Sequence, residues 1–219
     1  MNECEGIMPN EKVRQENIRN VIRQAMKLFV ANGIENTSME MIARESGLTL
    51  RSVQNYFHTK NDLYTAVLKN GYTIELNEIR SYFASEHYMS KSGAEQVIDI
   101  ISTTLNKAVE YSDIVFCTAQ MQHVVTRASN NCDDPQLTDN WRYIMEHVQN
   151  AFDKGVQDGS VGQTTNKEIV DVKTIMLGLL GIREQIAYAM CNKTMREIFD
   201  PETAVRKYTR QMELIFQVK

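Results

Sequence analysis

The chain has 219 residues, of which 42% are hydrophobic and 24% are charged, and this balance excludes a disordered chain. Its formal net charge of -4 excludes a uniformly basic protein that coats nucleic acid. Residues 11–70 nevertheless carry nine Lys and Arg against six Asp and Glu, so a basic first third suited to a polyanion precedes an acidic remainder.

The first two predicted helices are bounded by a glycine and by a capping pattern. Residues 1–12 are expected to form a flexible tail, after which apolar residues at helical spacing predict a helix that ends near Gly33. Thr37 and Glu40 have the spacing of a capping box, in which each side chain satisfies a backbone N–H near the other. This pattern predicts a second helix over about residues 38–46.

A short helix and a long one follow. Gly47 ends the second helix, and Thr49 is placed to cap a short third helix over about residues 50–56. Thr59 and Asp62 repeat the capping-box spacing and predict the start of a long fourth helix. The third helix has little apolar surface, although the helices before and after it in the sequence have more.

The rest of the chain also predicts helices, since only three prolines and ten glycines occur and methionine is frequent. Polar breaks separate segments of helical periodicity. Five more helices are expected, over about residues 94–111, 114–128, 137–155, 166–192 and 201–218.

The second and third helices have the spacing of a helix-turn-helix. Ala43 is small enough for two helices to approach closely, Gly47 permits a positive φ in the turn, and Val53 fills the angle between the helices. The polar side of the third helix would then enter a DNA major groove, where Arg can pair with guanine and Asn or Gln with adenine. Residues that flank the groove at helix N-termini would bind phosphates. The expected DNA-contacting residues are Thr37, Ser38, Thr49, Arg51, Ser52, Gln54, Asn55, Tyr56 and Lys60.

Other roles remain open for the polar residues of the third helix. Arg51 and Asn55, taken singly, could contact phosphates or only solvent instead of bases.

Residues of about 14–69 resemble the N-terminal domain of TetR-family transcriptional regulators. The resemblance lies in "AMKLFVANGIENTSMEMIARESGL", in Val53 and in "YFHTKNDLYTAV". Many members carry Gly or Pro at the position of Arg51 and Tyr at the position of Gln54, so the operator cannot be taken from another member.

The resemblance implies an all-α fold of about nine helices with two domains. A helix-turn-helix DNA-binding domain would occupy residues 13–69, and a larger ligand-binding and dimerisation domain residues 70–219. The last two helices would pair with those of a second subunit, and Gly178 and Gly181, one turn apart, would allow a close approach.

The implied function is a regulator, most simply a repressor, that binds a palindromic site in double-stranded DNA as a homodimer. A small apolar molecule would release it. An alternative with the same fold is a nucleoid or cell-division protein without such a ligand. The expected ligand-binding residues are Tyr111, Phe116, Met121, His123, Trp141, Met145, Met176 and Tyr188, chosen as aromatic, thioether and imidazole groups.

Other function classes lack their signatures. The four cysteines and four histidines show no metal-ligand spacing, and no phosphate-binding glycine loop or nucleophile elbow occurs. We therefore expect no cofactor, no metal, no catalytic residue and no enzyme. The stretch "IMLGLLGIREQIAYAM" is shorter than a membrane span, and its Arg183 and Glu184 are expected in a charge patch, solvated or at the subunit seam. Scattered thiols and a start unlike a signal peptide favour the cytoplasm.

Overall fold

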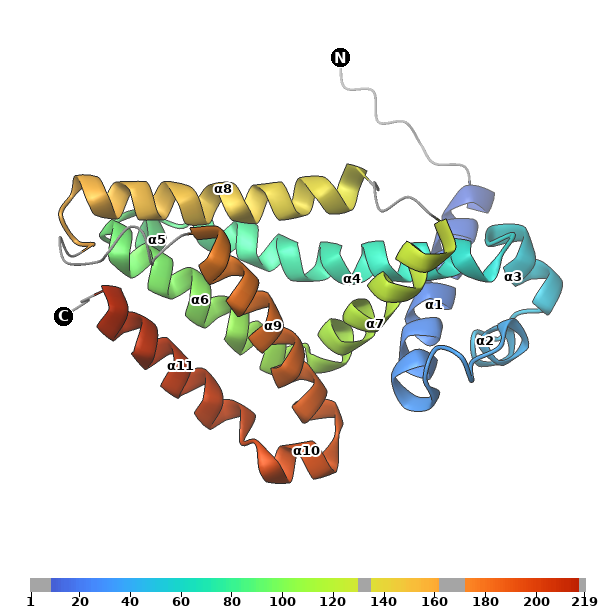
Figure 1. The fold of residues 1–219 in the computed structure, drawn as a ribbon. Helices are drawn as coiled ribbons and strands as arrows, with labels where there is room; N and C mark the ends of the chain where they lie inside the picture. The colour runs from blue at the N-terminus through green and yellow to red at the C-terminus, as the bar shows by residue number, and fades with distance from the viewer. Residues whose placement is uncertain (1–8, 130–134, 162–171, 217–219) are drawn as a thin grey trace, which may run out of the picture. The chain divides into compact units, whose positions relative to one another are not determined.

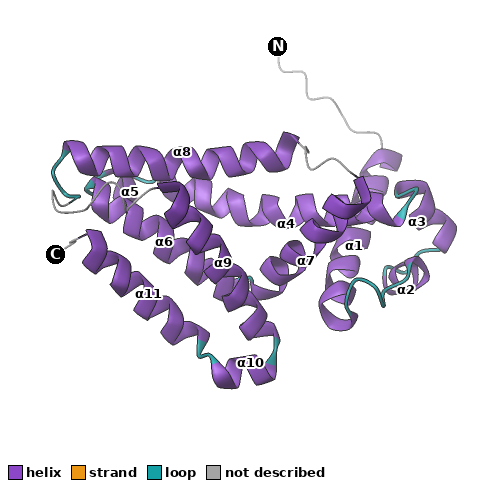
Figure 2. Cartoon of the chain, in the orientation of Figure 1, coloured by secondary structure: helices purple, strands orange, loops and turns teal. Residues whose placement is uncertain are grey.

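The computed structural model describes residues 9–129, 135–161 and 172–216, and every regular element in these ranges is a helix (Figures 1 and 2). The all-α prediction is therefore confirmed. The helices are α1 (Pro9–Asn32), α2 (Met39–Glu45), α3 (Leu50–Tyr56), α4 (Lys60–Phe83), α5 (Glu86–Met89), α6 (Gly93–Glu110), α7 (Ser112–Ser129), α8 (Pro135–Gln157), α9 (Val172–Cys191), α10 (Lys193–Ile198) and α11 (Pro201–Phe216).

Nine of these described helices correspond to the nine predicted ones, and the short α5 and α10 were not predicted. The helix α1 begins at Pro9, within the segment expected to be a tail. The predicted start of the ninth segment, residues 166–171, lies outside the described residues, as do residues 1–8 of the expected tail.

The structure divides into two compact units. The first comprises the described residues up to Asn70 together with residues 120–129, and the second comprises residues 71–119 and the described residues from 135 onward. The helices α4 and α7 each contribute to both units. The segment 120–129 was expected in the second domain.

The first unit is built around the apolar face of α1. Val21 and Ala25 are fully buried, and Phe29 meets Tyr64 of α4 edge-to-face, with 5.3 Å between the ring centroids. Ile42 of α2 is fully buried in the same unit. A rigid scaffold of three helices therefore supports the turn between α2 and α3.

The second unit is organised around α6, which packs against α8, α9 and α11 (Figure 1). Half of its 18 residues are buried. A capping box begins the helix, because Ser92 Oγ accepts from the Glu95 N–H while the Glu95 carboxylate accepts from the Ser92 N–H at 2.8 Å. The amphipathic pattern of α6 thus places its apolar face in the centre of the unit.

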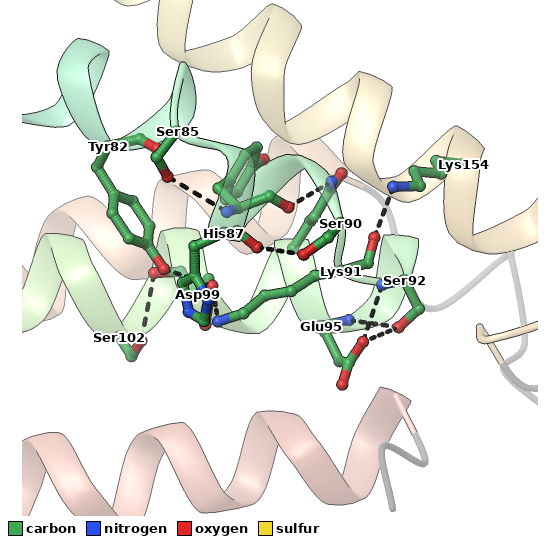
Figure 3. Close-up of polar contacts among 12 residues, drawn as sticks. Tyr82, Ser85, His87, Ser90, Lys91, Ser92, Glu95, Asp99, Ser102 and Lys154 are labelled. Carbon is green, nitrogen blue, oxygen red and sulfur yellow. Dashed lines mark hydrogen bonds and ion pairs between the residues drawn. The ribbon is translucent and has the colours of Figure 1, made fainter.

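A polar cluster fixes the corner where α4, α5 and α6 meet (Figure 3). Asp99 accepts a hydrogen bond from the Tyr82 hydroxyl at 2.6 Å and pairs with the Lys91 ammonium at 2.5 Å. Lys154 of α8 donates to the carbonyl oxygen of Lys91 at 2.5 Å. These contacts satisfy the half-buried charges and hold α8 against the corner.

The prediction for Arg183 in α9 is wrong. Arg183 is only 7% exposed and lies on the buried face of α9 with Met176 and Leu179, so it does not belong to a charge patch at the surface or the seam. No described helix combines the length and the apolar character that a membrane crossing requires.

Candidate DNA-binding site

The turn between α2 and α3 is a tight left-handed cap. Gly47 has φ of 68°, its N–H donates to the Arg44 carbonyl at 3.1 Å, and the Leu48 N–H donates to the Ala43 carbonyl at 3.0 Å. This pair of bonds is a Schellman motif, which ends a helix and reverses the chain within two residues. Asn20 of α1 also donates to the Ser46 carbonyl at 2.9 Å and ties the turn to the scaffold.

The short helix α3 is packed against the unit along one side and is capped at its N-terminus. Val53 is fully buried, as predicted, and Phe57 and Ala43 of α2 are also buried. Thr49 caps the helix, since its Oγ1 accepts from the Ser52 N–H at 3.1 Å. A seven-residue helix is not stable alone, so this support is what keeps α3 formed.

The opposite side of α3 is polar and accessible. Arg51, Gln54 and Asn55 are exposed, and Ser52 and Tyr56 are half-buried. The exposed groups are a guanidinium and two amides, which are the side chains that read guanine and adenine in the major groove. The structure thus brings together the predicted base-contacting residues on one accessible edge.

One predicted DNA contact is contradicted. Thr37 is buried, and its hydroxyl donates to the Gly33 carbonyl at 2.8 Å and lies 3.3 Å from the Leu28 carbonyl. It closes the end of α1 instead of facing DNA. The predicted capping box does not form, because Ser38 in place of Thr37 caps α2 by accepting from the Met41 N–H at 3.2 Å, and the Met41 side chain cannot complete a box.

The other flanking groups already have acidic neighbours. Glu40 lies in the first turn of α2, and its own backbone N–H and the Ser38 hydroxyl lower the pKa of its carboxyl. Asp62 accepts from the Thr59 N–H at 2.8 Å at the start of α4. Both carboxylates compensate helix-dipole charge, so a phosphate there must compete with them. Lys60 begins α4, and its ammonium, which lies 3.4 Å from the Ile34 carbonyl, supplies a positive charge at this helix N-terminus.

Two residues of α1 that the sequence analysis did not include hold Tyr56. The Asn17 side-chain amide donates to the Tyr56 hydroxyl at 3.2 Å, and the Arg14 guanidinium lies 5.7 Å from the centre of its ring. Their spacing of three residues places both on one side of α1. No local pattern indicates this contact, because 39 residues separate Asn17 from Tyr56.

The first comparison concerns this helix-turn-helix unit. Residues 21–67 match the family of bacterial regulatory proteins called the tetR family. The match covers α2, α3 and the turn just described, together with the second half of α1 and the start of α4. Over this N-terminal segment the chain is therefore similar to the TetR family.

An HTH-type transcriptional regulator of Staphylococcus aureus is 28% identical over 100 residues, which cover 43% of this chain and 54% of that protein. The match therefore spans about half the length of the curated relative.

Solved structures show that the fold of the whole chain is that of TetR-family proteins. A bacterial regulatory protein in the tetR family from Rhodococcus RHA1 superposes with a TM-score of 0.70 at 13% identity, over 91% of this chain and 96% of that one. FadR from Bacillus subtilis, solved in complex with stearoyl-CoA, has a TM-score of 0.62 at 16% identity, over 90% of this chain and 97% of that one.

The predicted ligand residues do not form one described site. Phe116 of α7 stacks on Tyr188 of α9 with 5.6 Å between centroids, and Met176 is buried in the core of the second unit. Tyr111 lies under the Lys107 ammonium, Met145 is partly buried at the core, and Met121 is buried in the segment assigned to the first unit. The side chains of His123 and Trp141 lie outside the described residues.

The described residues contain an apolar pocket elsewhere. It has a volume of about 290 Å³ and lies between α9, α10 and α11. None of the eight predicted ligand residues lines it. Its walls come from the two helices expected at the subunit seam and from the segment that joins them.

Proposed function

We propose that this chain is a ligand-responsive transcriptional repressor that binds a palindromic operator as a homodimer. The observation that carries the proposal is the accessible edge of α3, where Arg51, Gln54 and Asn55 project from a helix held below by Val53 and Phe57. A helix of this kind can enter the major groove with its polar side, while its buried side stays packed against the rest of the unit outside the groove.

Base readout follows from the chemistry of the exposed groups. Arg51 can donate two hydrogen bonds to guanine, and Asn55 or Gln54 can form a bidentate pair with adenine. Lys60, Thr49 and the hydroxyl of Ser38 supply sequence-independent contacts to phosphates, which set register and affinity.

Homodimer formation is supported by the apolar surface of the last helices. Of the nine large apolar side chains that are exposed among the described residues, five belong to α9, α10, α11 and the residue that follows α10. These five are Leu177, Ile198, Phe199, Leu214 and Ile215. One head reads too few base pairs for selectivity in a genome, and a twofold dimer doubles the number read.

Release by a small, largely apolar molecule is the second part of the proposal. Its supports are the apolar interior of the second unit, the Phe116–Tyr188 stack, and the stearoyl-CoA in the FadR structure of similar fold. The alternative, a nucleoid or cell-division protein of the same fold, needs no such ligand. Insensitivity of DNA binding to every ligand tested would favour that alternative.

Selection of operators from random DNA tests the proposed function. We expect enrichment of a palindrome, with half-sites that the double variant Arg51→Ala/Asn55→Ala no longer prefers. Arg142→Ala is the matched control, because it removes an exposed Arg from α8 without touching the first unit. Failure of the wild-type protein to enrich any sequence would refute the proposal.

A further inference from the structure

The outward face of α9 carries one prominent apolar side chain. Leu177 is 73% exposed, more than any other large apolar residue in the described ranges. It lies on the side of the helix opposite the buried Met176, Leu179 and Arg183. Leu177 is one of five exposed large apolar side chains that α9, α10, α11 and the residue after α10 carry, and exposed apolar groups that concentrate on neighbouring elements indicate a contact that a single copy of the chain does not make.

The next turn of the same face carries a hole. Gly181 is exposed, and a Cβ added to it would meet no other atom within 4 Å. Its surface forms one edge of the 290 Å³ pocket between α9, α10 and α11. A cavity of about 150 Å³ is large enough for benzene, so this pocket has room for a leucine side chain. Among the residues that line it are Ile182, Ile186, Met195, Phe199 and Pro201.

The helix α10 forms a wall of this pocket and is itself uncovered. None of its six residues is buried, and Ile198 and Phe199 are exposed at its end. The segment is well capped, since Asn192 accepts from the Met195 N–H at 3.0 Å and the Phe199 N–H donates to the Met195 carbonyl at 2.8 Å. A capped helix without buried residues gains most of its stability only when another surface covers it.

We propose that Leu177 of each subunit inserts into the pocket beside Gly181 of the other. The inference rests on the proposed homodimer and names the contact that orders its interface. In a twofold interface, residue i of one copy meets residue j of the other and j meets i. A protruding side chain and a hole four residues apart, about 6 Å along one helix, satisfy this condition if the axis crosses α9 between them.

The chemistry of the face favours a second copy of this chain as the occupant. The protruding Leu177 and the hole lie on one helix, so a single rotation matches both pairs at once. Gly178 and Gly181, which are both exposed, leave space for a second backbone to approach. The pocket lining is almost wholly apolar, with Gln185 as its one polar side chain, which suits an aliphatic group.

Two substitutions test the contact without disturbing the fold of one copy. Leu177→Ala empties the hole, and Gly181→Leu fills it. Leu177 is exposed and the space beside Gly181 is open, so each variant should keep the wild-type helix content. We expect each to raise the dissociation constant of the dimer by roughly a hundredfold or more, because two leucine contacts are lost per dimer. Sedimentation over a concentration series measures the constant.

Mixing the two variants tests the pairing itself. A heterodimer of Leu177→Ala with Gly181→Leu has one wild-type contact, and at the other the truncated side chain of the first variant faces the filled hole of the second. We therefore expect the heterodimer to be at least tenfold tighter than either variant homodimer, measured with one partner labelled at its terminus. Met89→Ala, at an exposed residue of α5, is the matched control and should leave the dimer unchanged.

The outcomes separate this inference from the proposed dimer. Variants that dimerise as tightly as the wild type would overturn the Leu177 contact and leave the homodimer standing. A heterodimer no tighter than the variant homodimers would overturn the pairing of the leucine with the hole. A wild-type protein that sediments as a monomer throughout would overturn both proposals.

Discussion

Gly93→Ala is expected to destabilise the second unit severely, because the start of α6 touches the backbone of α8. A Cβ on Gly93 would lie 1.9 Å from the Gly155 nitrogen, 2.3 Å from its Cα and 2.5 Å from the Ala151 carbonyl oxygen. All three are backbone atoms, so no side-chain rotation relieves the clash. One of the two helices must move away from the other.

The magnitude has two parts. The Cβ is about 1.5 Å short of an ordinary contact, and overpacking of this kind costs about 1–3 kcal/mol. Moving α6 also weakens two bonds at its N-terminus, from the Gly93 N–H to Asp158 Oδ2 at 2.9 Å and from the Ala94 N–H to Ser160 Oγ at 3.0 Å. Their loss adds about 2–4 kcal/mol. The total, about 3–7 kcal/mol, is a large fraction of a typical stability of about 5–15 kcal/mol.

Urea unfolding followed by fluorescence measures this loss, since Trp141, the single tryptophan, belongs to α8. Arg142→Ala is the control, because it removes an exposed side chain of α8 and should change the free energy of unfolding by no more than about 0.5 kcal/mol. If Gly93→Ala unfolded within about 1 kcal/mol of the wild type, the close approach of α6 to α8 would be refuted.

Three shorter predictions concern DNA and acid. Arg51→Ala and Asn55→Ala should each relax preference at one base pair per half-site, at a cost of about 1–3 kcal/mol; unchanged operator preference in both variants would contradict base readout. Lys60→Ala should weaken binding to all sequences alike and reduce the salt slope by about 1, seen in titrations at several salt concentrations. Bonds from Ser92 lower the pKa of Glu95, so its contribution to stability is present above its unfolded pKa and lost as pH falls through the lower folded value. Glu95→Gln should therefore flatten the loss of Tm between about pH 5 and 3, and an unchanged acid limb would count against this cap.

The first unit could be predicted from the sequence because its signals are local. The caps at Thr49 and at Thr59 with Asp62 act over three residues, and Gly47 has the positive φ that its turn requires. The same local rule failed at Thr37, since two hydroxyl residues precede α2 and either suits a cap. Contact with the end of α1 decided between them, and no spacing rule contains that contact.

Several features of the second unit could not be predicted from the apolar pattern of the sequence. The long helices of this unit, such as α6 and α8, carry enough turns for an apolar period to be read, whereas the four residues of α5 and the six of α10 do not. Arg183 was assigned by charge alone, although its spacing from Met176 and Leu179 places it on the buried face. The ligand residues were chosen by side-chain type, but none of the eight lines the described pocket, because its walls come from α9, α10 and α11, which only the fold brings together.

The final prediction is that ligand and operator oppose each other by the same factor. If a ligand lowers DNA affinity a hundredfold, the coupling free energy is about 2.7 kcal/mol, since each tenfold change is about 1.4 kcal/mol. The operator must then lower ligand affinity a hundredfold as well. DNA favours the state whose heads match half-sites about 34–36 Å apart, and only a ligand that prefers another state can release it. A ligand found by thermal shift should be titrated with and without the selected operator, and Arg142→Ala should show the same ratio. Equal ligand affinities in the two titrations would refute ligand-driven release, however tightly the ligand bound.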